Sequence, residues 1–168
     1  GLVVAGTTGE SATLLRDEFE TLLAAVVRRV AGRIPVLAGT GSASTAVAVR
    51  QTRRAAELGA DGVLVVTPYY IRPTQAGLRA HFTAVADAAA VPVVLYNVPA
   101  RTAVDMLPET VAALAAHPRI VGIKEAAGAQ GRIEELRARC GPDFTVLSGD
   151  DRSCLAAMKS GADGVISV

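Results

Sequence analysis

The chain has 168 residues, 51% of them hydrophobic, which is enough to bury one substantial core. Its formal net charge of +1 is dispersed, and no apolar run reaches the roughly 18–20 residues of a membrane-spanning helix, so we expect neither a nucleic-acid partner nor a membrane partner. His81, His117, Cys140 and Cys154 have the spacing of neither a metal site nor a disulfide framework, which argues against a metal and suits a reducing cytoplasm.

Seven short apolar, β-branched segments predict strands, and six stretches between them predict helices. The strands are expected over 2–5, 35–38, 62–67, 92–96, 120–124, 145–148 and 164–168. The helices are expected over 16–30, 45–58, 75–89, 108–116, 132–140 and 152–159. Because the strands do not alternate polar with apolar residues, both faces of the sheet should be covered, as in parallel sheets flanked by helices. Glycines just beyond four helices predict left-handed helix ends at Gly32, Gly59, Gly141 and Gly161.

The junction between a helix and the next strand recurs. The run Gly59-Ala60-Asp61-Gly62-Val63 returns as Gly161-Ala162-Asp163-Gly164-Val165. The same turn feeding the same kind of strand indicates a weak internal repeat.

Polar residues follow most of the strands, and their distribution bears on the fold. They are Thr7-Thr8, Thr40, Tyr69-Tyr70, Tyr96-Asn97, Lys124-Glu125 and Ser148 with Asp150-Asp151. An open sheet gathers ligand groups near one switch point, whereas in a barrel nearly every strand end faces one central site. The even distribution favours an α/β fold of the (β/α)8 TIM-barrel type. Seven strands are one short of eight, and both ends of the chain lie in apolar runs, so we expect a fragment of a longer protein.

Lys124 is the strongest catalytic candidate. It is one of two lysines beside fifteen arginines, and it ends an apolar run that reads as a buried strand. A desolvated lysine can lose its proton, and its neutral amine is a nucleophile towards carbonyls. The alternative is a structural lysine that reaches solvent from a strand end or pairs with Glu125.

Other residues support carbonyl chemistry. The loop Gly6-Thr7-Thr8-Gly9-Glu10-Ser11 offers amides and hydroxyls suited to a carboxylate; alternatively it is a capped loop in which Ser11 or Thr13 starts the next helix. Three tyrosines at strand ends offer phenols for proton transfer, and Arg101 offers a guanidinium for a carboxylate. Gly39-Thr40-Gly41 lacks the third glycine of a dinucleotide fingerprint and is interpreted as a tight turn. Together these residues fit carbon–carbon bond chemistry on a 2-oxo acid through an imine.

These motifs resemble the dihydrodipicolinate synthase (4-hydroxy-tetrahydrodipicolinate synthase) family along the whole chain. The matching runs are Gly6-Thr7-Thr8-Gly9-Glu10, Thr67-Pro68-Tyr69-Tyr70, Tyr96-Asn97-Val98-Pro99-Ala100-Arg101-Thr102, Gly122-Ile123-Lys124-Glu125-Ala126 and Leu147-Ser148-Gly149-Asp150-Asp151. The resemblance implies that residues 1–168 form part of a TIM-barrel catalytic domain, strands two to eight. The first strand, the last barrel helix and a C-terminal helical domain would be missing.

The resemblance also implies a Schiff-base-forming lyase of diaminopimelate and lysine biosynthesis, which condenses pyruvate with L-aspartate 4-semialdehyde. Lys124 would form the imine with pyruvate, so that no separate cofactor is needed. Tyr96 would be the central acid/base, linked to Thr7 and to Tyr70 of a neighbouring subunit in a homodimer or homotetramer. The implied substrate-binding residues are Thr8 for the pyruvate carboxylate, Arg101 for the semialdehyde carboxylate, and Gly149 and Ile166 as lining.

Two alternatives to this function remain open. The wider superfamily includes N-acetylneuraminate lyase and 2-keto-3-deoxy sugar acid aldolases, which share the lysine and the tyrosine. The Thr7-Thr8 pair and Arg101 resemble the synthase more. A non-catalytic 2-oxo-acid binding relative, or an inactive truncation product, is the other alternative. We also expect the 168-residue chain by itself to be insoluble or inactive, since a seven-stranded piece leaves two exposed sheet edges.

The resemblance finally bears on feedback inhibition. Members inhibited by lysine bind it at a dimer interface, and Ser11, Ala12 and Tyr69 match that site. The positions filled by His, His, Asn and Glu in the sensitive enteric type are here Arg16, Phe19, Ala43 and Val47. The loss of a carboxylate and the gain of a cation predict weak or absent inhibition by lysine.

Overall fold

The computed structural model describes residues 1–129 and 131–168, and these form one curled, all-parallel sheet of seven strands. The strands are β1 (Leu2–Val4), β2 (Val36–Gly39), β3 (Gly62–Val66), β4 (Val93–Asn97), β5 (Ile120–Glu125), β6 (Thr145–Ser148) and β7 (Gly164–Val165). Each strand pairs with the next one in the sequence, so β1 and β7 are the two edges. The predicted parallel α/β architecture is confirmed, and no strand end differs from its predicted position by more than three residues.

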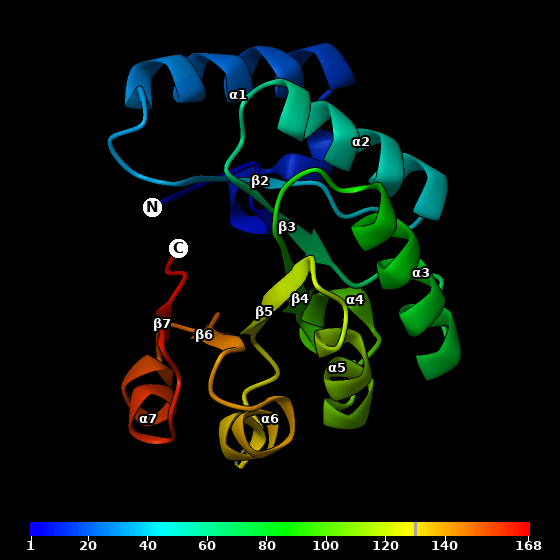
Figure 1. Ribbon diagram of the computed structural model, residues 1–168, viewed down its shortest axis with the longest axis vertical. Coiled ribbons are helices and arrows are strands. Elements are labelled where there is room, and N and C mark those ends of the chain that lie inside the picture. The colour runs from blue at the N-terminus through cyan, green and yellow to red at the C-terminus, as the bar shows by residue number, and fades with distance from the viewer. Residues whose placement is uncertain (130) are drawn as a thin grey trace.

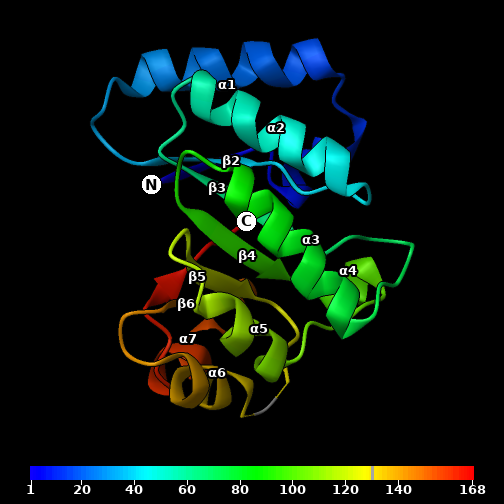
Figure 2. The same cartoon turned by 45° about the vertical axis from the view of Figure 1, so that its right-hand side comes forward.

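The helices lie in an arc around the outside of the curled sheet (Figure 1). They are α1 (Arg16–Val30), α2 (Thr45–Glu57), α3 (Gln75–Ala88), α5 (Pro108–Ala115), α6 (Arg132–Cys140) and α7 (Cys154–Lys159). Figure 2 shows α2, α3 and α5 following one another across the sheet, and neighbouring helices in this series contact each other. All six predicted helices are present, and the four glycines predicted at helix ends have positive φ angles.

Three short elements were not predicted. They are α4 (Pro99–Thr102) and two 3₁₀ turns, Thr7–Gly9 and Ser11–Thr13. These single turns are too short to show periodicity. The alternative in which Ser11 or Thr13 starts the next long helix is not what the structure contains. The helix α1 begins at Arg16, as predicted, and the Leu15 amide donates to the Glu18 carboxylate at 2.8 Å.

The sheet separates two apolar clusters. The larger outer cluster lies between the sheet and the helices and includes the fully buried Leu23, Phe82 and Ile123. The inner cluster, on the concave face, consists of Leu64, Val94, Tyr96 and Val98, with Ile166 among the half-buried residues packed against it. Both faces of the central strands are therefore covered, which explains why these strands are continuously apolar.

The internal repeat has a structural counterpart. The Asp61 carboxylate accepts a hydrogen bond from the Val36 amide at 2.8 Å, and the Asp163 carboxylate accepts one from the Val146 amide at 2.8 Å. In both copies an aspartate just before one strand satisfies the amide at the start of the preceding strand. The repeat therefore makes the same hydrogen bond between neighbouring strands at two places in the sheet.

The Gly39-Thr40-Gly41 segment is a packed turn, as the sequence indicated. A side chain at Gly39 would overlap the Ala5 carbonyl oxygen, and one at Gly41 would lie 2.5 Å from the Val66 amide nitrogen. Thr40 is buried and hydrogen-bonded to Thr52 at 2.9 Å. The glycines are needed for close packing of neighbouring backbone.

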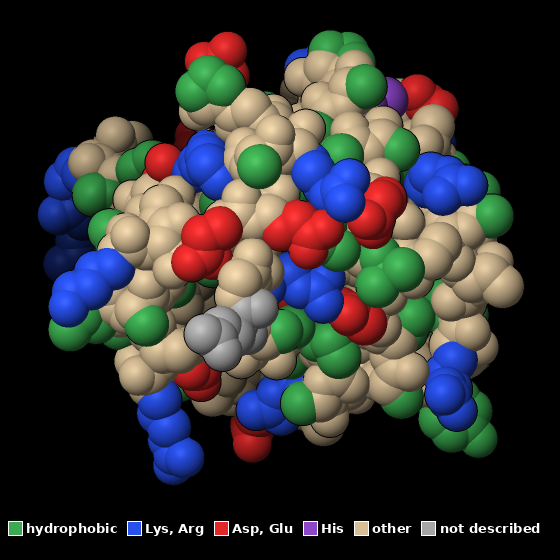
Figure 3. Space-filling model, turned by 90° about the horizontal axis from the view of Figure 1, so that it is seen from below, with side chains coloured by type: hydrophobic (Ala, Val, Ile, Leu, Met, Phe, Trp, Pro, Cys, Tyr) green, Lys and Arg blue, Asp and Glu red, His purple; other side chains and the backbone are tan. Residues whose placement is uncertain are grey.

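The surface mixes charges of both signs. The face seen from below carries acidic and basic side chains close together rather than a gathering of one sign (Figure 3). Some of these charges form ion pairs: Arg139 of α6 pairs with both Glu135 and Glu109. None of the helices in the described residues has the length and apolar character that crossing a membrane requires.

Candidate active site

Lys124 and Tyr96 face each other near the carboxyl ends of adjacent strands. They are directly paired residues in the ladder between β5 and β4. The Lys124 Nζ lies 4.5 Å from the centroid of the Tyr96 ring, and each residue is 6% exposed. An amine and a phenol are thus held together on the concave face of the sheet.

The environment of Lys124 favours its neutral amine. Burial lowers the pKa of Lys124, the positive charge of Arg101 lowers it further, and the negative charge of Asp151 opposes them. The alternative in which Lys124 pairs with Glu125 is not what the structure contains. Successive strand residues point to opposite faces, and the Glu125 carboxylate accepts hydrogen bonds from Asn97 on the helix-covered face.

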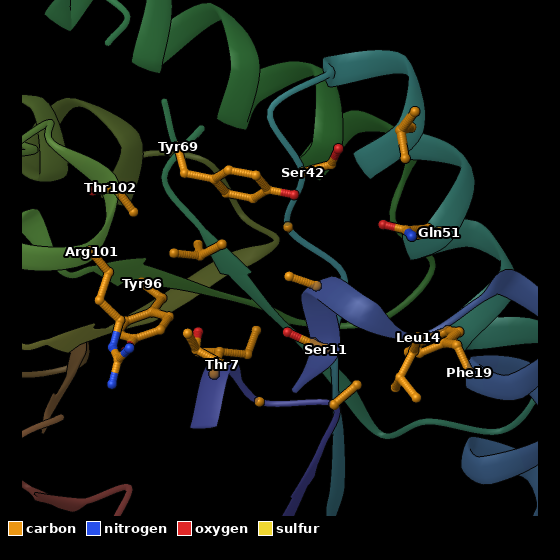
Figure 4. A pocket seen from close by; sticks show the side chains of 18 of the residues that line it. Thr7, Ser11, Leu14, Phe19, Ser42, Gln51, Tyr69, Tyr96, Arg101 and Thr102 are labelled. Atoms are coloured by element: carbon orange, nitrogen blue, oxygen red, sulfur yellow. The ribbon is translucent and has the colours of Figure 1, made fainter. Parts of the chain in front are cut away.

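Tyr96 retains its proton at neutral pH. Burial raises the pKa of Tyr96, and a hydrogen bond with Thr7 and the charge of Arg101 oppose this rise only in part. Tyr96, Thr7 and Arg101 line one cavity of about 500 Å³, whereas Lys124, Gly149 and Ile166 are not among its lining residues. Figure 4 shows Arg101 beside the Tyr96 ring, with Thr7 close to both. A phenol next to an amine whose pKa is lowered is suited to acid/base steps on a carbonyl bound to that amine.

Gly149 and Ile166 complete the surroundings. A Cβ at Gly149 would lie 2.7 Å from the Lys124 Cε and 3.0 Å from the Ala126 Cβ, so the glycine leaves the space that the lysine stem occupies. The Gly149 amide donates to the Glu125 carbonyl at 2.8 Å, which fixes it beside β5. Ile166 packs against the inner cluster that contains Tyr96.

Two candidates lie outside this arrangement. Tyr70 is 90% exposed with a φ of +71° and does not line the cavity, although its backbone amide donates to the Thr102 carbonyl at 3.3 Å. Thr8 is exposed in the turn after β1 and also does not line the cavity. Within a single chain these two side chains do not join Tyr96 and Lys124.

The residues matched to an effector site lie in the same cavity. Ser11, Ala12 and Tyr69 line it, and Arg16, Phe19 and Val47 do as well. Figure 4 shows the Tyr69 hydroxyl directed towards Ser42. The Arg16 side chain is 70% exposed and is paired with Glu20 at 2.9 Å, so its added charge is partly offset.

Sequence reasoning missed two features of the site. Leu64, Val66 and Val98 form an apolar wall of the cavity. The hydroxyl of Thr102, which also lines the cavity, accepts a hydrogen bond from the Thr67 hydroxyl at 3.1 Å. Leu64 and Val66 are two positions apart in β3 and therefore point to the same face of the sheet. They could have been predicted to line the site once it was known which face of the sheet is the inner one. Within residues 1–129 and 131–168, no three histidine, cysteine, aspartate or glutamate side chains lie close enough to hold a metal.

Comparison with known proteins identifies the family. The profile of the Dihydrodipicolinate synthetase family matches residues 1–168. The chain belongs to this family. It is 63% identical over 168 residues to the 4-hydroxy-tetrahydrodipicolinate synthase of Xanthomonas axonopodis pv. citri, covering 100% of this chain and 56% of that protein. The corresponding Stenotrophomonas maltophilia (strain K279a) protein is 61% identical, with 57% of its length covered.

Solved structures of the family have the same fold. The synthase of Methylacidiphilum fumariolicum superimposes with a TM-score of 0.98 at 46% identity, covering 100% of this chain and 56% of that one. The Acinetobacter baumannii synthase, solved in complex with pyruvate, gives a TM-score of 0.96 at 46% identity, covering 99% and 57%. This chain thus spans a little over half the length of its dihydrodipicolinate synthetase relatives.

Proposed function

We propose that the protein is a 4-hydroxy-tetrahydrodipicolinate synthase, which condenses pyruvate with L-aspartate 4-semialdehyde through an imine on Lys124. The observation that carries the proposal is the buried Lys124 amine facing the Tyr96 phenol, in a chain 61–63% identical to curated synthases. The pyruvate bound in the Acinetobacter baumannii relative supports the same substrate here.

The proposed steps use side chains of this chain. The neutral Lys124 amine attacks the ketone carbon of pyruvate, and loss of water gives the imine. Removal of a methyl proton gives an enamine, whose carbon attacks the aldehyde of the second substrate. The amino group of that substrate then displaces Lys124 and closes the ring. Tyr96, with Thr7, carries the protons in these steps.

The substrate-binding roles follow the family resemblance. Thr8 holds the pyruvate carboxylate, Arg101 holds the semialdehyde carboxylate, and Gly149 and Ile166 line the site. Tyr70 completes the proton pathway of a neighbouring subunit, and its 90% exposure supports this role. We therefore propose a homodimer or homotetramer, in the cytoplasm, with no cofactor beyond the covalent imine. In the complete protein, residues 1–168 would supply seven of the eight strands of a barrel.

The test is pyruvate-dependent consumption of aspartate semialdehyde by the complete protein. Lys124→Ala should abolish turnover and the trapping of pyruvate by borohydride. Lys159→Ala is the matched control, because it removes the other lysine, on the exposed end of α7, and should leave both unchanged. A trapped adduct without turnover would indicate a sibling aldolase with another aldehyde partner. Wild type that neither turns over nor traps pyruvate would indicate a binding protein and overturn the proposal.

Weak feedback is a second expected property. Val47 stands in the cavity where lysine-sensitive members carry a carboxylate, so the ammonium group of lysine would lack its partner. We expect half-maximal inhibition by lysine only at millimolar concentrations or higher. A steady-state titration checks this, and inhibition well below millimolar would contradict it.

A further inference from the structure

The ladder between β4 and β5 contains an irregularity on which the site depends. Val93 pairs with Ile120, but the next residue, Val94, pairs with Gly122, so Val121 is an extra residue in β5. Regular pairing from Val93 onward would have placed Ile123 opposite Tyr96. The bulge instead places Lys124 there. Bulges near active sites commonly re-aim a side chain in this way.

A buried hydrogen-bonded pair lies immediately beyond the bulge, on the opposite face of the same two strands. Asn97 and Glu125 are directly paired residues, 0% and 4% exposed. The Asn97 Nδ2 donates to both Glu125 carboxylate oxygens, at 3.2 and 3.1 Å. Each residue adjoins a reacting residue in sequence, Tyr96 in one strand and Lys124 in the other.

Further contacts anchor the pair to the surrounding backbone. The Ala127 amide donates to Glu125 at 2.7 Å, and the Met106 amide donates to the Asn97 Oδ1 at 3.0 Å. The Asn97 Nδ2 also donates to Asp105 at 2.8 Å, and Asp105 pairs with Arg132 on α6 at 2.5 Å. Hydrogen bonds thus connect the pair to the segment before α5 and, through Asp105, to α6. Several contacts together fix the positions of both side chains.

We propose that Asn97 and Glu125 are positioning residues, which lock β4 and β5 in the bulged register so that Lys124 and Tyr96 meet on the inner face. A one-residue slip of a strand moves its side chains to the other face, and a bulge leaves the regular register as a competing arrangement. The regular register would set Asn97 opposite Lys124 and separate the amide from the carboxylate. The pair therefore stabilises the arrangement in which the amine faces the phenol.

The test, which rests on the proposed function, is made in the complete protein with Asn97→Asp. This substitution preserves shape but replaces the donating amide with a carboxylate, which cannot donate to the Glu125 and Asp105 oxygens. We expect kcat and the rate of pyruvate trapping by borohydride to fall at least ~10-fold, since displacements of ~1 Å at a reacting group can cost ~100-fold. Adding Glu125→Gln should recover at least several-fold of both, because the new amide can donate to the introduced carboxylate.

Glu125→Gln alone keeps the test usable if Asn97→Asp does not fold. It preserves the bond from Ala127 and one bond from Asn97, and should lower the trapping rate ~3-fold or more while the protein still melts cooperatively. Thr52→Val is the matched control, because it removes a buried hydrogen bond to Thr40 outside the site. It should lower the melting temperature without lowering kcat.

The outcomes separate the two proposals. Folded Asn97→Asp and Glu125→Gln proteins with wild-type kcat and trapping rate would overturn the positioning role while leaving the proposed function intact. An equal loss of kcat in Thr52→Val would also overturn it, since the effect would then follow stability alone. Wild type that traps no pyruvate would overturn the proposed function and this inference with it.

Discussion

At the scale of single residues, the proposed chemistry depends on the burial of the Lys124 amine and the Tyr96 phenol. Lys124 is the buried lysine of this chain, and Lys159 is exposed. Burial and the nearby guanidinium of Arg101 act in the same direction on its amine. Burial raises the pKa of Tyr96, whereas it lowers the pKa of Lys124, because the charged form of a tyrosine is the deprotonated one. Desolvation at one site therefore favours the neutral form of both the Lys124 amine and the Tyr96 phenol.

This environment predicts the pH dependence of imine formation. The rate of pyruvate trapping should rise with pH as Lys124 loses its proton, with a midpoint below the ordinary lysine value of 10.5. Arg101→Met removes a positive charge, so it should raise the pKa of Lys124 and shift the midpoint to higher pH. Arg79→Met, on the exposed side of α3, should not move it. Coincident profiles for Arg101→Met and wild type would contradict the electrostatic account.

Gly149→Ala tests the space around the lysine stem. The added Cβ would lie 2.7 Å from the Lys124 Cε, and the flexible lysine can move aside more easily than the backbone. We therefore expect a change of only a few degrees in melting temperature but a loss of at least ~10-fold in kcat, as for other small displacements of a reacting group. Gly77→Ala, within α3, is the control and should retain activity. Unchanged kcat in Gly149→Ala would show that the lysine stem does not need this space.

At the scale of elements, the outer layer contains a buried histidine that has no role in the proposed reaction. His81 of α3 is 5% exposed and packs edge-on against Phe82, with ring centroids 5.1 Å apart. Its Nδ1 is hydrogen-bonded to the Thr45 hydroxyl of α2 at 2.9 Å, and its Nε2 is buried with no partner among the described residues. Burial lowers the pKa of His81 to about 4 from 6.5. The contact between α2 and α3 thus requires the neutral ring.

This histidine predicts acid sensitivity. Between pH 6.5 and about 4 the unfolded chain binds a proton at His81 that the folded chain does not, so stability is lost as pH falls through this range. The loss should reach up to about 3 kcal/mol. Urea unfolding of the complete protein at pH 7 and pH 4 measures it. His81→Phe should show a smaller loss, and equal losses in the variant and wild type would rule out His81 as the cause.

At the scale of the whole molecule, the curled sheet ends in two unpaired edges. β1 and β7 each have a single strand neighbour in the described chain, and Leu2 and Val165 on these strands are 45% and 44% exposed. Unpaired strand edges with apolar side chains are templates for pairing with other chains. The concave face of the same sheet, which carries the inner cluster, also includes residues that are only partly buried, such as Leu37 and Ile166.

We therefore expect the 168-residue chain, produced by itself, to self-associate. Size-exclusion chromatography with light scattering should give large, heterogeneous particles, and heating should give no cooperative transition. The complete protein, analysed in parallel, should give discrete oligomers. A monomeric 168-residue chain with a cooperative melt would contradict this expectation.

The order and type of the elements could be predicted from local sequence patterns. Apolar runs and helical spacing are local signals, and they located all seven strands and six helices to within a few residues. The candidate site residues could then be predicted from their positions after the strands, because parallel strands bring their carboxyl ends to one edge of the sheet. Lys124 could be selected over a structural lysine because the phenols, hydroxyls and guanidinium elsewhere in the chain fit the same carbonyl chemistry as its amine.

The tertiary structure decided which of these residues meet. The bulge at Val121 is set by pairing between strands, and it determines that Lys124 rather than Ile123 faces Tyr96. Asn97 and Glu125 could not be recognised as a pair from the sequence, because they are 28 residues apart and only strand pairing brings them together. The exposure of Tyr70 was equally undetermined. Burial, register and distance arise from long-range packing, which no local pattern encodes.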